Sequence, residues 1–110
     1  MATFDDFQKL DLRIGTVIRA EPFPEARVPA IKMEIDFGTE IGIKRSSAQI
    51  TVHYSPEQMV GRQVTAVVNF PPRRIAGYVS EVLVLGAVLP EGDVVLMNLD
   101  HQVPNGTKIG

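Results

Sequence analysis

The stretch IKMEIDF, Ile31 to Phe37, decides the fold class, because apolar and charged residues alternate through it without a break. A period of two places the apolar side chains on one face of a β-strand and the charged ones on the other. Gly38-Thr39-Glu40 follows as a turn, and residues 41–46 (IGIKRS) are the expected antiparallel partner. The sequence therefore predicts a half-buried β-hairpin in the first half of the chain.

Further strand patterns lie on both sides of this hairpin. Residues Arg13–Glu21 precede it, and Gln63–Phe70 is β-branched and alternating. Glu81–Leu85 ends in a continuous apolar run, which indicates a buried strand. With the two strands of the hairpin, five main strands are therefore expected. Val94–Leu99 is a further, short strand that follows them near the end of the chain.

Three shorter segments complete the pattern. Residues 3–11 (TFDDFQKLD) predict a short helix capped by Thr3. Ser55-Pro56-Glu57 is typical of a helix start with proline at the first helical position. Pro104-Asn105-Gly106 is typical of a tight turn, of type I′ or in a bulged hairpin.

This order of strands and helices is typical of one known architecture. Five strands with a helix between the third and the fourth are the plan of the OB-fold, a small Greek-key barrel. We therefore expect an all-β chain: one domain over residues 1–110, a five-stranded OB-fold barrel with a short N-terminal helix and terminal extensions. An SH3-like or other small barrel is the alternative. An OB-fold usually binds oligomeric ligands across one face and its flanking loops.

Composition limits the class of protein. The 110 residues include no cysteine, which excludes disulfides and thiolate metal sites. The N-terminal MATFDDFQKL does not resemble a signal peptide, and the longest apolar run, Val82–Leu89, is too short to span a bilayer. We expect a soluble protein of the cytoplasm.

Charge is unevenly distributed along the chain. The formal net charge is −2, but residues 41–79 contain five Lys or Arg and a single acid, Glu57. A basic middle on an acidic background can form a local positive patch. The alternative is that these charges simply solvate different faces.

Two basic clusters are candidate binding elements. Arg73 and Arg74 follow Pro71-Pro72, and two prolines hold a loop stiff, so that little entropy is lost on binding. Lys44, Arg45, Ser46 and Ser47 end the predicted third strand, which lies on the binding face of an OB-fold. Such groups suit phosphate oxygens and peptide carbonyls equally. A solubilising hairpin corner and a strand end with a cap are the structural alternatives.

The loop Glu21–Ala30 is the third candidate. Its three prolines make it rigid, Phe23 offers an apolar contact and Arg27 a cation. We expect Phe23 to be a ligand contact, and the alternative is a plug folded back on the barrel.

No catalytic constellation is present in the sequence. His53 and His101 lack the spacing of a metal pair, and Ser46-Ser47 has no His and Asp partners. We expect no enzyme activity, no metal and no cofactor.

Several longer stretches carry a family resemblance. DLRIG at residues 11–15, IKMEIDFG and NFPPRRIAGYVSEVLVLG resemble the tRNA-binding domain family, an OB-fold module found free and appended to some aminoacyl-tRNA synthetases. EPFPEARVPAIK and the ending VPNGTKIG are most similar to its CsaA-type branch of export-related molecular chaperones. The resemblance covers nearly the whole chain. It implies a homodimer that binds unfolded or pre-secretory polypeptides, with export machinery as a further partner, and tRNA or RNA binding as the alternative.

This sequence departs from the tRNA-binding pattern at three positions. The pattern Asn-Leu-Lys-Pro-Arg-Lys, followed by Ser-x-Gly-Met, has Pro71 in place of its first lysine, Val82 in place of glycine and Leu83 in place of methionine. One cation is lost, and Val82 adds a side chain where a backbone could approach closely. These changes favour an apolar ligand such as an extended peptide.

The residue patterns and the family resemblance together indicate which residues contact a ligand or a second chain. We expect the ligand to lie in a groove lined by six mainly apolar residues: Phe23, Ile43, Phe70, Pro72, Ile75 and Tyr78. Polar contacts are expected from Arg27, Lys44, Arg45, Ser46, Ser47, Arg73, Arg74 and Ser80. The resemblance places a dimer interface at the two ends of the chain, through Phe4, Phe7, Leu10, Val103 and Ile109. The alternative is that the terminal segments pack on their own barrel.

Overall fold

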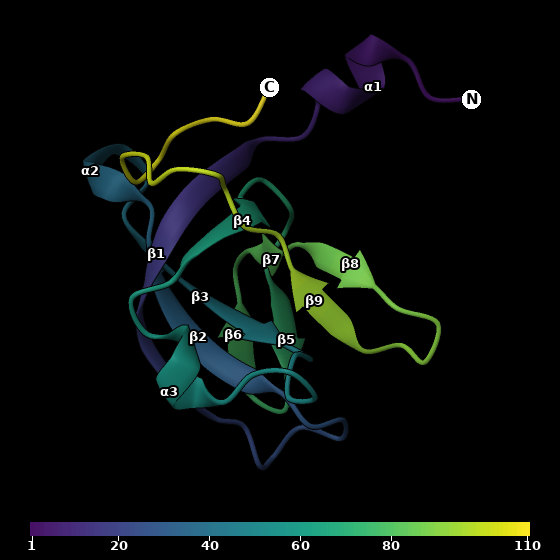
Figure 1. Cartoon of the computed structure of the whole chain (residues 1–110). Coiled ribbons are helices and arrows are strands. Elements are labelled where there is room, and N and C mark those ends of the chain that lie inside the picture. Colours follow the sequence, from purple (N-terminus) through teal and green to yellow (C-terminus); the bar gives the residue numbers. More distant parts are fainter.

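The computed structural model describes residues 1–110 and is built around a five-stranded antiparallel sheet that curls into a nearly closed barrel (Figure 1). The strand order in this sheet is β3-β2-β1-β4-β7. Its members are β1 (Leu12–Pro22), β2 (Ile31–Asp36), β3 (Ile43–Ala48), β4 (Gln63–Val67) and β7 (Leu83–Val84). The predicted all-β fold, a five-stranded OB-fold Greek-key barrel, is confirmed.

Strand β1 makes the curvature possible because it belongs to two ladders. Leu12 to Thr16 pairs with β4, and Thr16 to Pro22 pairs with β2. The register with β2 shifts between Val17 and Arg19, and the extra residue, Ile18, points to solvent. A bulge of this kind bends a strand and increases its twist.

The barrel closes between β3 and the segment that enters β7. The amide of Glu81 donates to the carbonyl of Arg45 at 2.8 Å. The hydroxyl of Ser46 donates to the Val82 carbonyl at 2.9 Å. The amide of Ser47 donates to the Ser80 hydroxyl at 3.2 Å. Mixed backbone and side-chain hydrogen bonds therefore replace a continuous ladder at this seam.

The core is formed by the inward faces of the strands. On β2 the predicted alternation is confirmed: Ile31, Met33 and Ile35 are buried and the residues between them are not. Helix α3 (Pro56–Met59) covers one end of the barrel and buries Met59 completely. Ser55 caps α3 in a capping box with Pro56 in the first turn, as the sequence predicts.

Two short helices differ in how they relate to the barrel. Helix α1 (Phe4–Gln8) begins at Thr3, whose hydroxyl accepts from the Asp6 amide. In return, the Asp6 carboxylate accepts the Thr3 backbone amide, and this hydrogen bond lowers the pKa of Asp6. α1 buries none of its residues and projects from the barrel (Figure 1). Helix α2 (Gly38–Ile41) is a single turn where the sequence predicts a turn.

Two hairpins lie outside the main sheet. One joins β5 (Arg73–Ile75) to β6 (Tyr78–Ser80), and the other joins β8 (Gly86–Val88) to β9 (Val94–Leu96). The prediction of one buried strand over Glu81–Leu85 is wrong. Only Val82 in it is buried, whereas Leu83 is 43% exposed, because β7 is an edge strand of two residues. The last predicted strand is confirmed but ends at Leu96.

The C-terminal segment returns to β1 of the same barrel. The Ile14 amide donates to Thr107, and the amides of Gly106 and Ile109 donate to β1 carbonyls, at 2.7 to 2.9 Å. Gly106 has a φ of 90°, and a Cβ there would lie 2.6 Å from the Phe37 carbonyl oxygen, so that only glycine fits. Asn105 has no positive φ, so the predicted turn exists but is not of type I′. None of the helices is long and apolar enough to cross a membrane.

Candidate functional site

The basic cluster on β3 divides between two sides of the strand. Ser46 pairs with Met33 and Lys44 with Ile35, two inward-facing positions, whereas Arg45 pairs with the outward-facing Glu34. Side chains alternate along a strand, so Lys44 and Arg45 point to opposite sides. These two cations therefore do not converge on one ligand group.

Arg45 belongs to a cluster around Tyr78 on the outer face of the barrel. Phe23 is only 4% exposed and meets the Tyr78 ring edge-on, with the centroids 5.5 Å apart. The Lys32 ammonium lies 5.2 Å from the Phe23 centroid and 5.4 Å from that of Tyr78, and the Arg45 guanidinium lies 5.6 Å from Tyr78. The Tyr78 hydroxyl donates to the Met33 carbonyl at 3.2 Å. Phe23 therefore folds back on the barrel and packs against the Tyr78 ring. Partial burial of the Tyr78 phenol raises its pKa.

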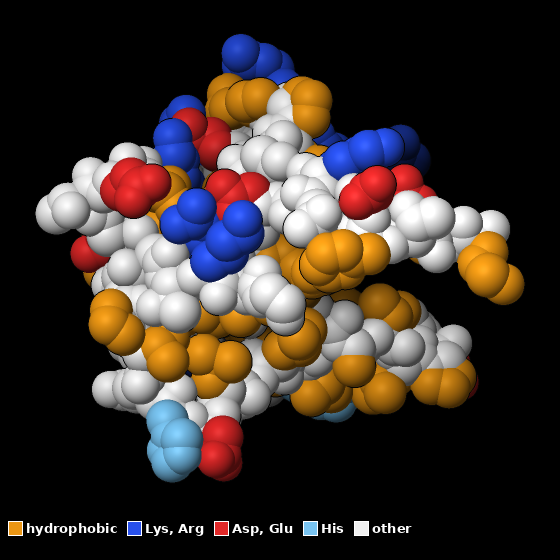
Figure 2. Space-filling view, turned by 90° about the horizontal axis from the view of Figure 1, so that it is seen from above, with side chains coloured by type: hydrophobic (Ala, Val, Ile, Leu, Met, Phe, Trp, Pro, Cys, Tyr) orange, Lys and Arg blue, Asp and Glu red, His pale blue; other side chains and the backbone are white.

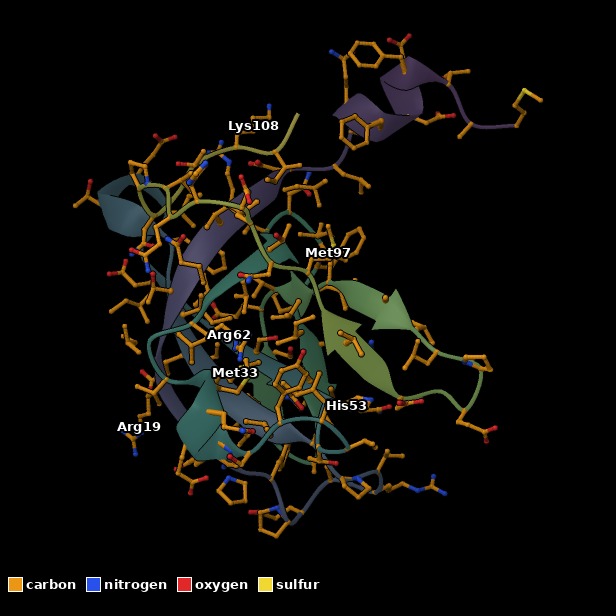
Figure 3. The ribbon with its side chains drawn as sticks, in the orientation of Figure 1. Arg19, Met33, His53, Arg62, Met97 and Lys108 are labelled. Atoms are coloured by element: carbon orange, nitrogen blue, oxygen red, sulfur yellow. The ribbon has the colours of Figure 1, made fainter.

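The cations of this outer face are already paired with carboxylates. The ion pairs are Arg19 with Glu21 at 3.8 Å and with Glu34 at 3.7 Å, Lys32 with Glu21 at 3.2 Å, and Arg45 with Glu81 at 3.6 Å (Figure 3 labels Arg19 at the edge of the barrel). A phosphate that bound here would have to compete with these carboxylates for each cation. The outer face is therefore poorly suited to bind a phosphate backbone.

A groove of about 720 Å³ lies beside this face, and we call it the apolar groove. Its walls come from the β1–β2 loop, the end of β3, the β5–β6 hairpin and the β7–β8 segment. The lining residues are Glu25, Ala26, Arg27, Val28, Ala30, Ser47, Ala48, Gln49, Ile50, Arg73, Ile75, Ala76, Leu83, Val84, Leu85, Gly86, Val88 and Val94. Most of these residues are apolar, and a site of this size can accommodate a short extended peptide or a small molecule.

Four of the predicted binding residues meet in the apolar groove. Arg27, Ser47, Arg73 and Ile75 line it, although they come from three separate parts of the sequence. Arg73 and Ile75 lie two positions apart on β5 and share a face, whereas Arg74 lies between them and does not line the groove. Neither Arg27 nor Arg73 forms an ion pair within the chain, so both are free to contact a ligand.

The other predicted residues lie elsewhere. Ile43 and Phe70 are exposed, at 55% and 43%, but neither lines the apolar groove, and neither does Pro72. Ser46 is fully buried, and the hydroxyls of Ser46 and Ser80 both take part in closing the barrel. These two hydroxyls are engaged by the fold and do not face a ligand.

One wall of the apolar groove was not predicted from the sequence, and it is formed by Leu83, Val84, Leu85, Val88 and Val94. The sequence does contain an apolar run here, Val82–Leu89, but such a run is equally typical of a strand buried in the core. The position of β7 at the edge of the sheet turns part of that run towards solvent.

The predicted interface residues at the two ends of the chain differ in exposure. Phe4 and Phe7 on α1 are 71% and 40% exposed, and Leu10 is half-buried. Val103 and Ile109 are half-buried, and their backbone amides donate within their own barrel, Val103 to the Gln63 side-chain oxygen and Ile109 to the Leu12 carbonyl. Figure 2 shows hydrophobic side chains on both sides of a hollow at the right, where α1 and the β8–β9 hairpin project in Figure 1. Further apolar residues of that hairpin and its exit are exposed: Val88, Leu89, Val95 and Met97.

No group of three or more His, Cys, Asp or Glu side chains comes together in the way that a metal site requires. Each histidine contacts one carboxylate, His53 that of Asp93 and His101 that of Asp100.

Comparison with known proteins connects this architecture to a family. A family model described as "Putative tRNA binding domain" matches residues 12–108. The methionine–tRNA ligase of Flavobacterium psychrophilum is 38% identical over 97 residues, and the methionine–tRNA ligase of Bacteroides fragilis is 36% identical over 106 residues. These matches cover 88% and 96% of this chain but only 14% and 15% of the ligases.

Two solved structures match the whole chain. The crystal structure of chaperone CsaA from Bacillus anthracis str. Ames has a TM-score of 0.95 at 64% identity and covers 100% of this chain and 99% of its own. The CsaA chaperone protein from Picrophilus torridus has a TM-score of 0.91 at 45% identity and covers 100% of both chains. With the family model matching nearly all of the barrel, the chain belongs to the tRNA-binding domain family.

Proposed function

We propose that this chain is an ATP-independent molecular chaperone that holds unfolded or export-competent polypeptide segments in the apolar groove. The observation that carries the proposal is the groove itself, because its apolar walls are combined with the unpaired guanidinium groups of Arg27 and Arg73. Apolar surface binds hydrophobic side chains of any sequence, and arginine can bind peptide carbonyls or acidic side chains. The similar CsaA structures, which are described as chaperones, support the same function.

The proposal gives the protein a holding mechanism that needs no nucleotide. The clients are unfolded polypeptides, including pre-secretory ones, so we place the protein in the cytoplasm, before export. A single groove would bind such segments weakly. Two grooves in a homodimer would raise the avidity by about 10²-fold without new contacts, provided that one client spans both.

Suppression of client aggregation tests this proposal. Leu83→Gln adds a polar group to the groove wall, at a residue that is 43% exposed, and should reduce protection of a chemically denatured client several-fold. Val60→Gln is the matched control, because Val60 is 52% exposed and lies outside the groove. Equal protection by both variants, or none by the wild type at stoichiometric amounts, would contradict the proposal.

The two neighbouring arginines provide a second, sharper comparison. Arg73→Ala removes a cation from the apolar groove, whereas Arg74→Ala removes the same charge one residue away, outside it. Binding of an unfolded, fluorescently labelled peptide should therefore weaken in Arg73→Ala and stay close to wild type in Arg74→Ala. A loss of equal size in both variants would show that net charge, and not groove geometry, governs binding.

tRNA binding is the second candidate function, favoured by the family match over residues 12–108. Of the predicted cations, Arg27, Lys44, Arg73 and Arg74 have no carboxylate partner within the chain, whereas Arg45 is paired with Glu81. If all four unpaired cations contact phosphates, log affinity should fall with log salt with a slope of about −3, at about −0.7 per contact on single strands. Electrophoretic mobility shifts with tRNA at several salt concentrations measure this slope. A flat response, or no shift at low salt, would exclude RNA as the ligand.

We also propose that the protein forms a homodimer through α1. Phe4 and Phe7 project from a helix that buries none of its own residues, so the barrel does not cover them. Half-buried Leu10 extends this surface. The exposed apolar side chains of the β8–β9 hairpin face the same hollow (Figure 2). A second chain seated in this hollow would cover both.

A further inference from the structure

A polar cavity of about 400 Å³ lies between the α3–β4 connection and the chain after β9, and we call it the polar cavity. Its lining is Gln58, Gly61, Arg62, Gln63 and residues 98–102. None of these residues lines the apolar groove, so the polar cavity is a separate feature of the molecule. Arg62, the residue before β4, is the one lysine or arginine in this lining, and Figure 3 labels it.

Arg62 is held in place from both its backbone and its side chain. Its amide donates to the Met59 carbonyl at 3.1 Å, and its carbonyl accepts from the Val17 amide at 2.9 Å. The guanidinium carbon lies 5.1 Å from the centre of the Tyr54 ring, within the range of a cation–π contact. The Tyr54 hydroxyl in turn accepts from the Leu96 amide at 2.9 Å. The guanidinium is therefore oriented before any ligand arrives.

This guanidinium has no anionic partner within the chain. Its Nε is buried and makes no hydrogen bond with the protein, and no carboxylate forms an ion pair with it. Asp100 is the only acid that lines the polar cavity, but its side chain is 96% exposed and pairs with His101 at 3.2 Å. A buried donor without an acceptor is unfavourable. The two Nη groups of the same guanidinium also make no hydrogen bond within the chain and, unlike Nε, are not buried, so an oxyanion in the cavity would accept hydrogen bonds from them and neutralise the unpaired charge.

We propose that the polar cavity binds the phosphate group of a small ligand, with Arg62 as the primary contact. Further donors surround it. The side-chain oxygen of Gln58 already accepts from the Ser55 amide, which leaves its NH₂ free, and the amides of Asn98 and Gln102 make no hydrogen bond within the chain. Phosphate presents more acceptor oxygens than a carboxylate and matches the planar fork of arginine. The cavity is larger than the ion, so the rest of a phosphomonoester also fits.

Side-chain NMR of arginine tests this proposal directly. On titration with inorganic phosphate, the Nε–H resonance of Arg62 should shift and saturate, and Arg62→Gln should weaken phosphate binding at least about tenfold. Arg19→Gln is the matched control, because Arg19 is exposed, is paired with Glu21 and Glu34 and lines neither site, so the phosphate affinity of this variant should be unchanged. Arg62→Lys keeps the charge and the contact with Tyr54 but loses the fork, so it provides a second variant if Arg62→Gln does not fold.

Three further probes define the ligand. A nucleoside monophosphate that binds more tightly than inorganic phosphate supports a small phosphomonoester, and equal binding supports a site for free phosphate. A short single-stranded RNA that binds more tightly than both inorganic phosphate and the nucleoside monophosphate would overturn the assignment to a small ligand. Tighter binding of acetate than of phosphate, or an Arg62 resonance that phosphate leaves unchanged, would overturn the proposal.

Discussion

The hydroxyl of Ser46 lies at the seam where the barrel closes, fully shielded from solvent. It donates to the Val82 carbonyl, and Ser80 lies 3.5 Å from the same carbonyl oxygen. Two serines that were expected to contact a ligand are thus hydrogen-bonded within the fold. Their sequence context does not distinguish the two roles, because a serine in a strand faces inward or outward according to register alone.

Ser46→Ala should lower the free energy of unfolding by about 1 kcal/mol, because a buried carbonyl loses its nearest hydrogen-bond donor. Urea denaturation measures this change. Ser47→Ala is the control, since the Ser47 side chain is only half-buried and lines the apolar groove, and it should change stability by less than about 0.5 kcal/mol. A loss of equal size in both variants would show that the Ser46 hydrogen bond is not the cause.

Tyr78 predicts a dependence of stability on high pH. Burial raises the pKa of its phenol, so the folded state keeps the proton at pH values where the unfolded chain has lost it. This contribution to stability is complete below the ordinary tyrosine pKa of about 10 and is lost as the pH rises through the higher folded pKa.

An absorbance titration near 295 nm measures this ionisation. The chain has two tyrosines, so the difference between the titrations of wild type and Tyr78→Phe isolates Tyr78. The midpoint of that difference should lie above about 10. A midpoint at or below 10 would show that the phenol is exposed to solvent.

At the scale of elements, the β5–β6 hairpin carries a strained turn. Ala76 and Gly77 join the two strands with φ values of 46° and 83°, the signature of a type I′ turn. A positive φ costs alanine about 1 kcal/mol or more, and asparagine tolerates it better. Ala76→Asn should therefore stabilise the protein by about 0.5–1 kcal/mol, since Asn-Gly is the preferred pair for this turn.

Gly77→Ala should have the opposite effect, because it places a Cβ at a φ of 83° even though nothing lies within 4 Å of that position. Chemical denaturation compares the two variants, and amide hydrogen exchange in β5 and β6 shows whether the change is local. If both changes have the same sign, the turn geometry is not what limits the stability of this hairpin.

Strand alternation also decides which charges act together. Arg73 and Arg74 are adjacent in sequence, but only Arg73 lines the apolar groove, and Lys44 and Arg45 likewise point to opposite sides of β3. A pair of neighbouring cations on a strand is therefore two separate contacts.

At the scale of the whole molecule, the exposed apolar surface between α1 and the β8–β9 hairpin predicts the oligomeric state. Phe4→Ser combined with Phe7→Ser should shift a dimer towards monomer in size-exclusion chromatography with light scattering, because both rings are exposed in the single chain. Val52→Ser is the control, since Val52 is 72% exposed but lies in the turn after β3. A mass that stays dimeric in the Phe variant would place the interface elsewhere.

Much of the fold was predictable from local sequence. The alternation over Ile31–Phe37 determined the strand and its buried face, and Thr3 and Ser55-Pro56 determined where α1 and α3 begin. These features depend on neighbours within a few residues, through strand periodicity and hydrogen bonds at helix ends. The order of the elements then restricted the choice to a small barrel, and the family resemblance pointed to the same architecture.

Only the tertiary structure decided which side chains meet. Barrel closure brought Arg27, Ser47, Arg73 and Ile75 to one groove, turned Ser46 inward and set Phe23 beneath Tyr78. It also left Arg62 without a carboxylate partner. The physical reason is that strand register, the bulge in β1 and the edge position of β7 depend on contacts between residues far apart in the chain. No local pattern records such contacts.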